Sequence, residues 1–173
     1  MLDETDAQVL SITGGKPATH AVVPVGCGSI AQAVAQHYKS SASETGSGSS
    51  TAVLSVEPDT AACLKASLEA GKMTSVSTQD SIMCGMNCGT LSTTAWPVLQ
   101  CGIDGAVMVT DAESHQAVLE LQKLGITAGP CGAATLAALK KACDLERERL
   151  GFSDQSVVVL FCTEGPREYA ATT

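Results

Sequence analysis

The sequence is poor in aromatic and in basic residues. Aromatic side chains make up 3% of its 173 residues, and only 10 Lys and Arg stand against 18 Asp and Glu, which gives a net charge of −8. The basic residues are scattered along the chain, so they form no cationic stripe that could neutralise the phosphates of a nucleic acid. We therefore do not expect a DNA- or RNA-binding protein.

Long apolar runs and a basic leader are also missing. No apolar run reaches the ~20 residues that a helix needs to cross a bilayer, and the first six residues are acidic where a secretory signal would be basic. We expect a cytoplasmic protein without a membrane partner. Hydrophobic residues make up 45% of the chain, enough to bury a core, so we expect a single domain over residues 1–173.

The eight cysteines do not have the spacing of a metal site. The closest pair is Cys84 and Cys88, and the three histidines are isolated from one another. Several cysteines lie in apolar or small-residue runs, where a reduced thiol behaves as a small hydrophobic group. We expect no metal site and no disulfide scaffold.

Hydrophobic periodicity predicts strands that alternate with helices. Short, fully apolar runs indicate strands, and apolar residues at helical spacing follow them. This alternation is typical of a parallel sheet that helices cover on both faces. We therefore predict an α/β fold with about four parallel strands. The predicted strands are 20–25, 51–56, 105–109 and 156–161, and the predicted helices start at Ser29 or span 61–70, 111–124 and 132–150.

Turns and loops are predicted between these elements. Glu57, Pro58 and Asp59 are expected to form a turn, and Asp111 is expected to cap the helix that follows it. The Ser/Gly-rich stretch 40–50 is predicted to be a flexible surface loop. Residues 77–94 mix glycine, methionine, cysteine and hydroxyl side chains, so they form either an irregular crossover or a pocket wall.

Two predicted strands end in polar turns that contain glycine, Gly26-Cys27-Gly28-Ser29 and Thr163-Glu164-Gly165. Ligands of parallel sheets bind beyond the carboxyl ends of the strands, so we expect both turns at one edge. In the first turn, glycine permits close approach of the backbone, and the start of the next helix attracts an anion. The alternative is a tight turn that needs glycine for its backbone alone. The third glycine of G-x-G-x-x-G is absent, which argues against a dinucleotide site.

Five segments along the chain carry a resemblance to a known family. They are ATHAVVPVGCGS (18–29), VEPD with the following Cys63-Leu64, SIMCGMNCG (81–89), GPCGA (129–133) and LFCTEG (160–165). In this order they resemble the C-terminal half of diaminopropionate ammonia-lyase-like proteins, which are fold-type II, tryptophan-synthase-β-like pyridoxal-phosphate enzymes. The resemblance implies the fold of their large domain. It also implies that residues 26–29 hold the cofactor phosphate and that residues 163–165 lie beside the pyridine ring.

The sequence also departs from this family. The family's Schiff-base lysine lies upstream of all the matched segments, and none of the seven lysines here matches its motif. The small domain that closes over the substrate has no counterpart. Around Cys131 the family more often carries an acidic and a hydroxyl residue, and after Gly165 its acidic motif is replaced by Pro166-Arg167-Glu168. We therefore expect no ordinary ammonia-lyase activity from this chain alone.

Three functions remain open. In the first, the chain is a repurposed enzyme that uses no cofactor. Its former cofactor cleft binds a hydrophobic small molecule for a cyclisation, isomerisation or cycloaddition in secondary metabolism. In the second, the chain binds pyridoxal phosphate non-covalently, or it is a fragment or subunit of an ammonia-lyase. In the third, it is a non-catalytic interaction or regulatory domain.

The candidate site residues come from the two polar turns, from the irregular segment with Trp96 after it, and from the segment 129–133. Ser29, Asn87 and Thr163 are the predicted catalytic hydrogen-bond donors, and Glu164 is either an acid–base group or a loop anchor. The predicted substrate-binding residues are Gly26, Cys27, Gly28, Met83, Met86, Trp96 and Cys131. Loss of half of the family's fold would expose the apolar surface that this half covers. Because self-association would bury that surface, we expect a homodimer or a larger homo-oligomer.

Overall fold

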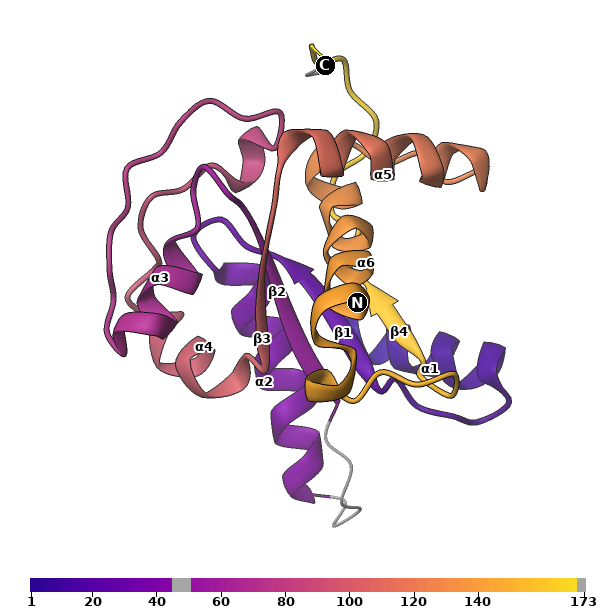
Figure 1. Ribbon diagram of the computed structural model, residues 1–173. Helices are drawn as coiled ribbons and strands as arrows, with labels where there is room; N and C mark the ends of the chain where they lie inside the picture. Colours follow the sequence, from indigo (N-terminus) through magenta and orange to yellow (C-terminus); the bar gives the residue numbers. More distant parts are fainter. Residues whose placement is uncertain (45–50, 171–173) are drawn as a thin grey trace.

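The protein has an α/β fold built on a four-stranded parallel sheet (Figure 1). A computed structural model describes residues 1–44 and 51–170. The strand order is β3-β2-β1-β4, and neighbouring strands all run parallel. The strands are β1 (His20–Pro24), β2 (Ala52–Pro58), β3 (Gly105–Val109) and β4 (Val158–Leu160). The predicted fold class is therefore confirmed.

Helices cover both faces of the sheet. Two of them, α5 (Asp111–Lys123) and α6 (Pro130–Leu150), pack on one face. On the other face lie α2 (Ser29–Glu44), α3 (Cys63–Ala70) and α4 (Trp96–Gly102), with α1 (Leu2–Thr13) at its margin. A short 3-10 helix, η1 (Cys84–Met86), lies in the irregular segment. No helix in the described ranges is both long and apolar enough to cross a membrane.

Strand β1 is the centre of the core. All five of its residues are buried, and it pairs with β2 on one side and β4 on the other. Successive side chains of a strand point to opposite faces. Val22 accordingly packs in the cluster beneath α5 and α6, and Val23 packs in the cluster beneath α2 and α4. The continuous apolar run is thus explained by burial on both sides.

Several predicted boundaries differ from the structure. Glu57 and Pro58 lie in β2 and do not form a turn, because pairing with β3 continues to Pro58 opposite Val109. Residues 40–44, predicted to be loop, continue α2, and the rest of that predicted loop lies outside the described residues. Helix α1 was not predicted because it has no fully buried residue.

The N-cap of α5 is Thr110 and not Asp111. Its hydroxyl accepts a hydrogen bond from the N–H of Glu113 at 3.1 Å, and the Glu113 carboxylate accepts one from the N–H of Thr110 at 2.7 Å. This reciprocal pair is a capping box, which satisfies two N–H groups at the start of the helix. Asp111 instead accepts hydrogen bonds from the Ser81 hydroxyl and the Ile82 N–H.

We predict that Thr110→Ala lowers the free energy of unfolding by about 1 kcal/mol, because a free N–H is left at the start of α5. Urea denaturation measures the change. The matched control is Thr127→Ala, since Thr127 is exposed and precedes α6 without capping it. Equal effects of the two substitutions would contradict the capping role.

Candidate functional site

A pocket of about 360 Å³ opens at the carboxyl ends of β1 and β4. The turn that follows β1 (residues 26–29, the glycine turn) and the turn that follows β4 (residues 163–165, the C-terminal turn) meet there, as the sequence predicted. These two turns form two walls of the pocket. Gly85 and Met86 of the irregular segment form a third wall, and the start of α6 adds Cys131. The residues that line the pocket are Pro24, Gly26, Cys27, Gly28, Ser29, Ile30, Gly85, Met86, Cys131, Thr163 and Glu164.

The backbone of the glycine turn requires glycine. Gly28 has a φ of +99°, and a Cβ atom there would lie 2.9 Å from the Leu99 side chain. The Gly28 carbonyl accepts the first hydrogen bond of α2, from the N–H of Gln32 at 2.8 Å. Across residues 1–44 and 51–170, no protein acceptor is found for the N–H groups of Gly28, Ile30 and Ala31. These unpaired donors at a helix N-terminus are suited to an anion.

Cys27 and Ser29 are exposed side chains of the same turn. The Cys27 sulfur lies 3.6 Å from the Ser29 hydroxyl. Hydrogen bonds from the side chain and backbone of Ser29 lower the pKa of the Cys27 thiol below its ordinary value. The turn therefore favours negative charge at its rim as well as at its N–H groups.

Glu164 fixes the C-terminal turn to the start of α6. Its carboxylate accepts a hydrogen bond from the N–H of Cys131 at 2.7 Å, and its carbonyl accepts one from the N–H of Gly129 at 3.0 Å. The other carboxylate oxygen lies 2.8 Å from Nε of Arg167. These bonds favour the loop-anchor role of Glu164, and its acid–base role stays a prediction.

The structure separates three predicted site residues from the pocket. Met83 is fully buried in the core cluster beneath α5 and α6, and Trp96 packs against the opposite cluster. The side-chain amide of Asn87 donates to the carbonyl of Gln79 at 3.0 Å, which holds the irregular segment together. The structure therefore does not bring these three residues to the pocket wall. Met83 and Asn87 belong to an irregular segment without a periodicity that fixes which way its side chains point, and Trp96 begins α4, which packs against the opposite cluster. The other eight candidates line the pocket, although their chemical roles stay predictions.

Glu57, which sequence analysis assigned to a turn, is buried behind the glycine turn with 1% of its surface exposed. Its two carboxylate oxygens accept the N–H groups of Leu64 and Lys65 at 2.7 and 2.8 Å, at the start of α3. The Cys63 thiol donates to the carbonyl of Gly26 at 3.8 Å. Burial raises the pKa of Glu57 from an ordinary 4.5 to about 7, although the two N–H groups act in the opposite direction.

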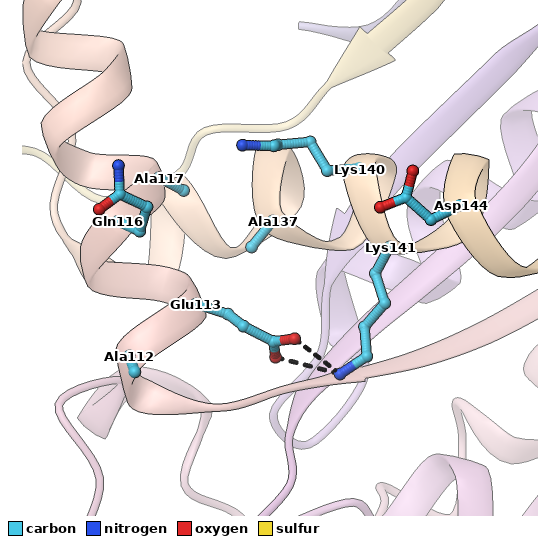
Figure 2. A pocket seen from close by; sticks show the side chains of 8 residues that line it. All are labelled: Ala112, Glu113, Gln116, Ala117, Ala137, Lys140, Lys141 and Asp144. Atoms are coloured by element: carbon cyan, nitrogen blue, oxygen red, sulfur yellow. Dashed lines mark hydrogen bonds and ion pairs between the residues drawn. The ribbon is translucent and has the colours of Figure 1, made fainter.

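A second pocket, of about 420 Å³, lies between α5 and α6 (Figure 2). Three of its charged groups already form ion pairs: Lys141 pairs with Glu113 at 2.9 Å, and Lys140 pairs with Glu120 at 2.7 Å. Asp144 adds a single carboxylate. Alanines form much of its floor. It offers no set of unpaired groups for chemistry. Within the described ranges, no cluster of three or more His, Cys, Asp or Glu side chains could hold a metal ion.

The family can be assigned from sequence comparison. The sequence model of the family described as pyridoxal-phosphate dependent enzyme matches residues 5–163. The chain belongs to this family. No curated protein sequence is significantly similar to the chain.

Solved structures of several enzymes share the fold. The threonine deaminase of T.th. is 26% identical with a TM-score of 0.76, over 96% of this chain and 56% of that one. Diaminopropionate ammonia lyase from Escherichia coli is 25% identical with a TM-score of 0.76, over 95% and 43%. Maize serine racemase, 22% identical, has the same fold with a TM-score of 0.77, over 95% and 48%. The chain thus spans about half the length of these structures.

The family assignment corrects the expected cofactor. The prediction that the chain uses none is wrong, because the family match and the similar structures point to pyridoxal phosphate. They give no support to a cofactor-free cyclase and fit the ammonia-lyase alternative better. The free N–H groups of the glycine turn fit the phosphate of this cofactor. None of the lysines, all of which lie in the described ranges, lines the pocket.

We predict that Gly28→Ala lowers the free energy of unfolding by about 1–3 kcal/mol. The new Cβ atom clashes with the Leu99 side chain, and a positive φ is unfavourable for alanine. The control is Gly165→Ala, since no atom lies within 4 Å of its added Cβ and its φ is not positive. Thermal unfolding of both variants checks this. A Gly28 variant as stable as the Gly165 variant would disprove the strain.

We predict a pH dependence from Glu57. Its folded-state pKa of about 7 exceeds the ordinary 4.5, so its contribution to stability is fully present below pH 4.5 and is lost as the pH rises through 7. The stability advantage of the wild type over Glu57→Gln should therefore shrink between pH 5 and pH 8, by an amount on the order of 3 kcal/mol. Urea denaturation at several pH values measures it. An advantage that grows with pH would show that the two N–H groups outweigh burial.

Proposed function

We propose that residues 1–173 form the phosphate-binding part of a pyridoxal-phosphate site in an enzyme related to ammonia-lyases, with a small amino acid as its substrate class. The observation that supports this best is the glycine turn. Among the residues that the structure describes, no protein acceptor is found for its N–H groups at Gly28, Ile30 and Ala31, which stand at the start of α2 beside the pocket. A dianionic phosphate is the ligand that such a turn favours.

The lining residues divide the proposed site into two parts. The N–H groups of the glycine turn and the Ser29 hydroxyl would hold the phosphate. Thr163 would offer its hydroxyl to the ring, on the opposite wall, with Met86 and Cys131 as apolar contacts. When bound, pyridoxal phosphate supplies an electron sink that stabilises negative charge on the α-carbon of an amino acid. The protein's own residues bind and orient the cofactor and exclude water from its apolar walls.

The amine for covalent attachment is proposed to come from residues outside this sequence. None of the seven lysines lies at the pocket, and the chain spans about half the length of the similar structures. A further segment or subunit would then complete the site from the open side of the pocket. This is consistent with an ammonia-lyase fragment or subunit.

Phosphate recognition can be tested without covalent chemistry. Pyridoxine 5′-phosphate has no aldehyde, so it cannot react with surface lysines, and pyridoxine lacks only the phosphate. We predict that the chain binds pyridoxine 5′-phosphate at least about tenfold more tightly than pyridoxine, because the phosphate is the group held by free N–H donors. Isothermal titration calorimetry measures both affinities.

Substitution in the pocket provides the matched control. Gly26→Ala places a Cβ atom 3.1 Å from the Gly85 carbonyl oxygen, inside the pocket wall, and should weaken binding of the phosphate compound. Thr127→Ala, at an exposed residue outside the pocket, should not weaken it. Equal affinity for the two probes, or no binding of either, would refute the proposed function.

A further inference from the structure

Arg167 connects three walls of the pocket. Its Nε lies 2.8 Å from the Glu164 carboxylate, and its guanidinium also donates to the carbonyl of Ile82. The same Glu164 carboxylate accepts the N–H of Cys131. One ion pair therefore ties the C-terminal turn, the irregular segment and the start of α6 to one another.

The close approach of these walls depends on glycine. A Cβ atom on Gly129 would lie 2.5 Å from the Glu164 carboxylate, and one on Gly132 would lie 2.6 Å from the sulfur of Cys162. The chain after β4 thus lies directly against the first turn of α6, as the yellow segment of Figure 1 shows. Glu164 reaches the N–H of Cys131 only because no side chain intervenes.

The guanidinium of Arg167 is itself held from α5. It lies 5.6 Å from the centre of the Tyr169 ring, and the Tyr169 hydroxyl lies 2.8 Å from Nδ1 of His115. The side chains of Arg167 and Glu164 are 30% and 21% exposed, so the pair is only partly screened by water. Such a pair has a fixed position, in contrast to an ion pair between two freely moving surface side chains.

The charge of this pair matters for an anionic ligand. Glu164 lines the pocket, and its carboxylate would repel a phosphorylated ligand if it stood alone. Arg167 adjoins the carboxylate and neutralises it.

We propose that Arg167 is a positioning residue of the proposed cofactor site: it joins the three walls and cancels the charge of Glu164, so that the pocket accepts a phosphorylated ligand. The charge effect rests on the proposed function, whereas the joining of the walls does not. Two separate measurements therefore test the two effects.

Ligand binding tests the charge effect. At low salt, Arg167→Ala should weaken binding of pyridoxine 5′-phosphate by about tenfold or more and binding of pyridoxine much less. Arg167→Lys, which keeps the charge, and the double variant Arg167→Ala with Glu164→Gln, which removes both charges, should recover most of the phosphate affinity. The control is Arg147→Ala, which breaks an exposed ion pair with Asp154. Equal weakening of both probes, without recovery in either rescue variant, would overturn the charge effect.

Hydrogen exchange of the protein without ligand tests the joining of the walls. Arg167→Ala should speed amide exchange at residues 82–86, 129–133 and 162–165, and Arg147→Ala should not. Unchanged exchange in all three segments would overturn this part of the proposal. If the wild type bound neither probe but exchange rose as expected, the proposed function and the charge effect would fail and the joining role would stand.

Discussion

Parallel pairing of β1 with both of its neighbours is the constraint on which the site depends. Because β2 and β4 both run parallel to β1, their carboxyl ends lie at one edge of the sheet. Residues 26–29 and 163–165, more than a hundred positions apart in sequence, become opposite walls of one pocket for this reason. The hydrogen bond from the Phe161 N–H to the Val22 carbonyl, at 3.0 Å, sets how far the C-terminal turn extends beyond β1. The pocket is thus a consequence of sheet topology.

The sequence predicted those parts of the fold in which local pattern and burial agree. The run at 20–25 is apolar because β1 is buried on both faces, and the glycines after it mark a turn whose φ excludes other residues. Prediction failed where tertiary contacts override local preference. Glu-Pro-Asp has the composition of a turn, yet pairing with β3 keeps Glu57 in a strand and α3 provides the N–H groups that its carboxylate needs. Helix α1 could not be found from an apolar stripe, since it is held in part by Asp6, which bonds to His37 and Tyr38 of α2.

The same difference between local pattern and tertiary contacts explains which site residues could be predicted from the sequence. Both turns could be placed at one edge, because strand ends follow from strand order and direction. Met83 and Asn87 could not be placed, because their segment has no repeating geometry, and its path depends on hydrogen bonds to distant residues such as that from Ile82 to Asp111. Trp96 could not be placed because the packing of α4 turns it to the opposite cluster. Gly85 was missed as a wall residue for a related reason. Its carbonyl approaches the backbone of Gly26, and only the resemblance of residues 81–89 to a known family marked that segment at all.

The arrangement of charge around the pocket follows from hydrogen bonds between carboxylates and the starts of helices. The free N–H groups of the glycine turn attract an anion, so any carboxylate nearby must be neutralised or bonded elsewhere. Glu57, on the far side of the turn, has both oxygens bonded at the start of α3, and Glu164, on the opposite wall, is bonded at the start of α6 and paired with Arg167. Glu57 and Glu164 therefore each accept backbone N–H groups at the start of a different helix. Within residues 1–44 and 51–170, the start of α2 keeps three N–H groups without a protein acceptor, which makes it the place in this pocket where a phosphate is best accommodated.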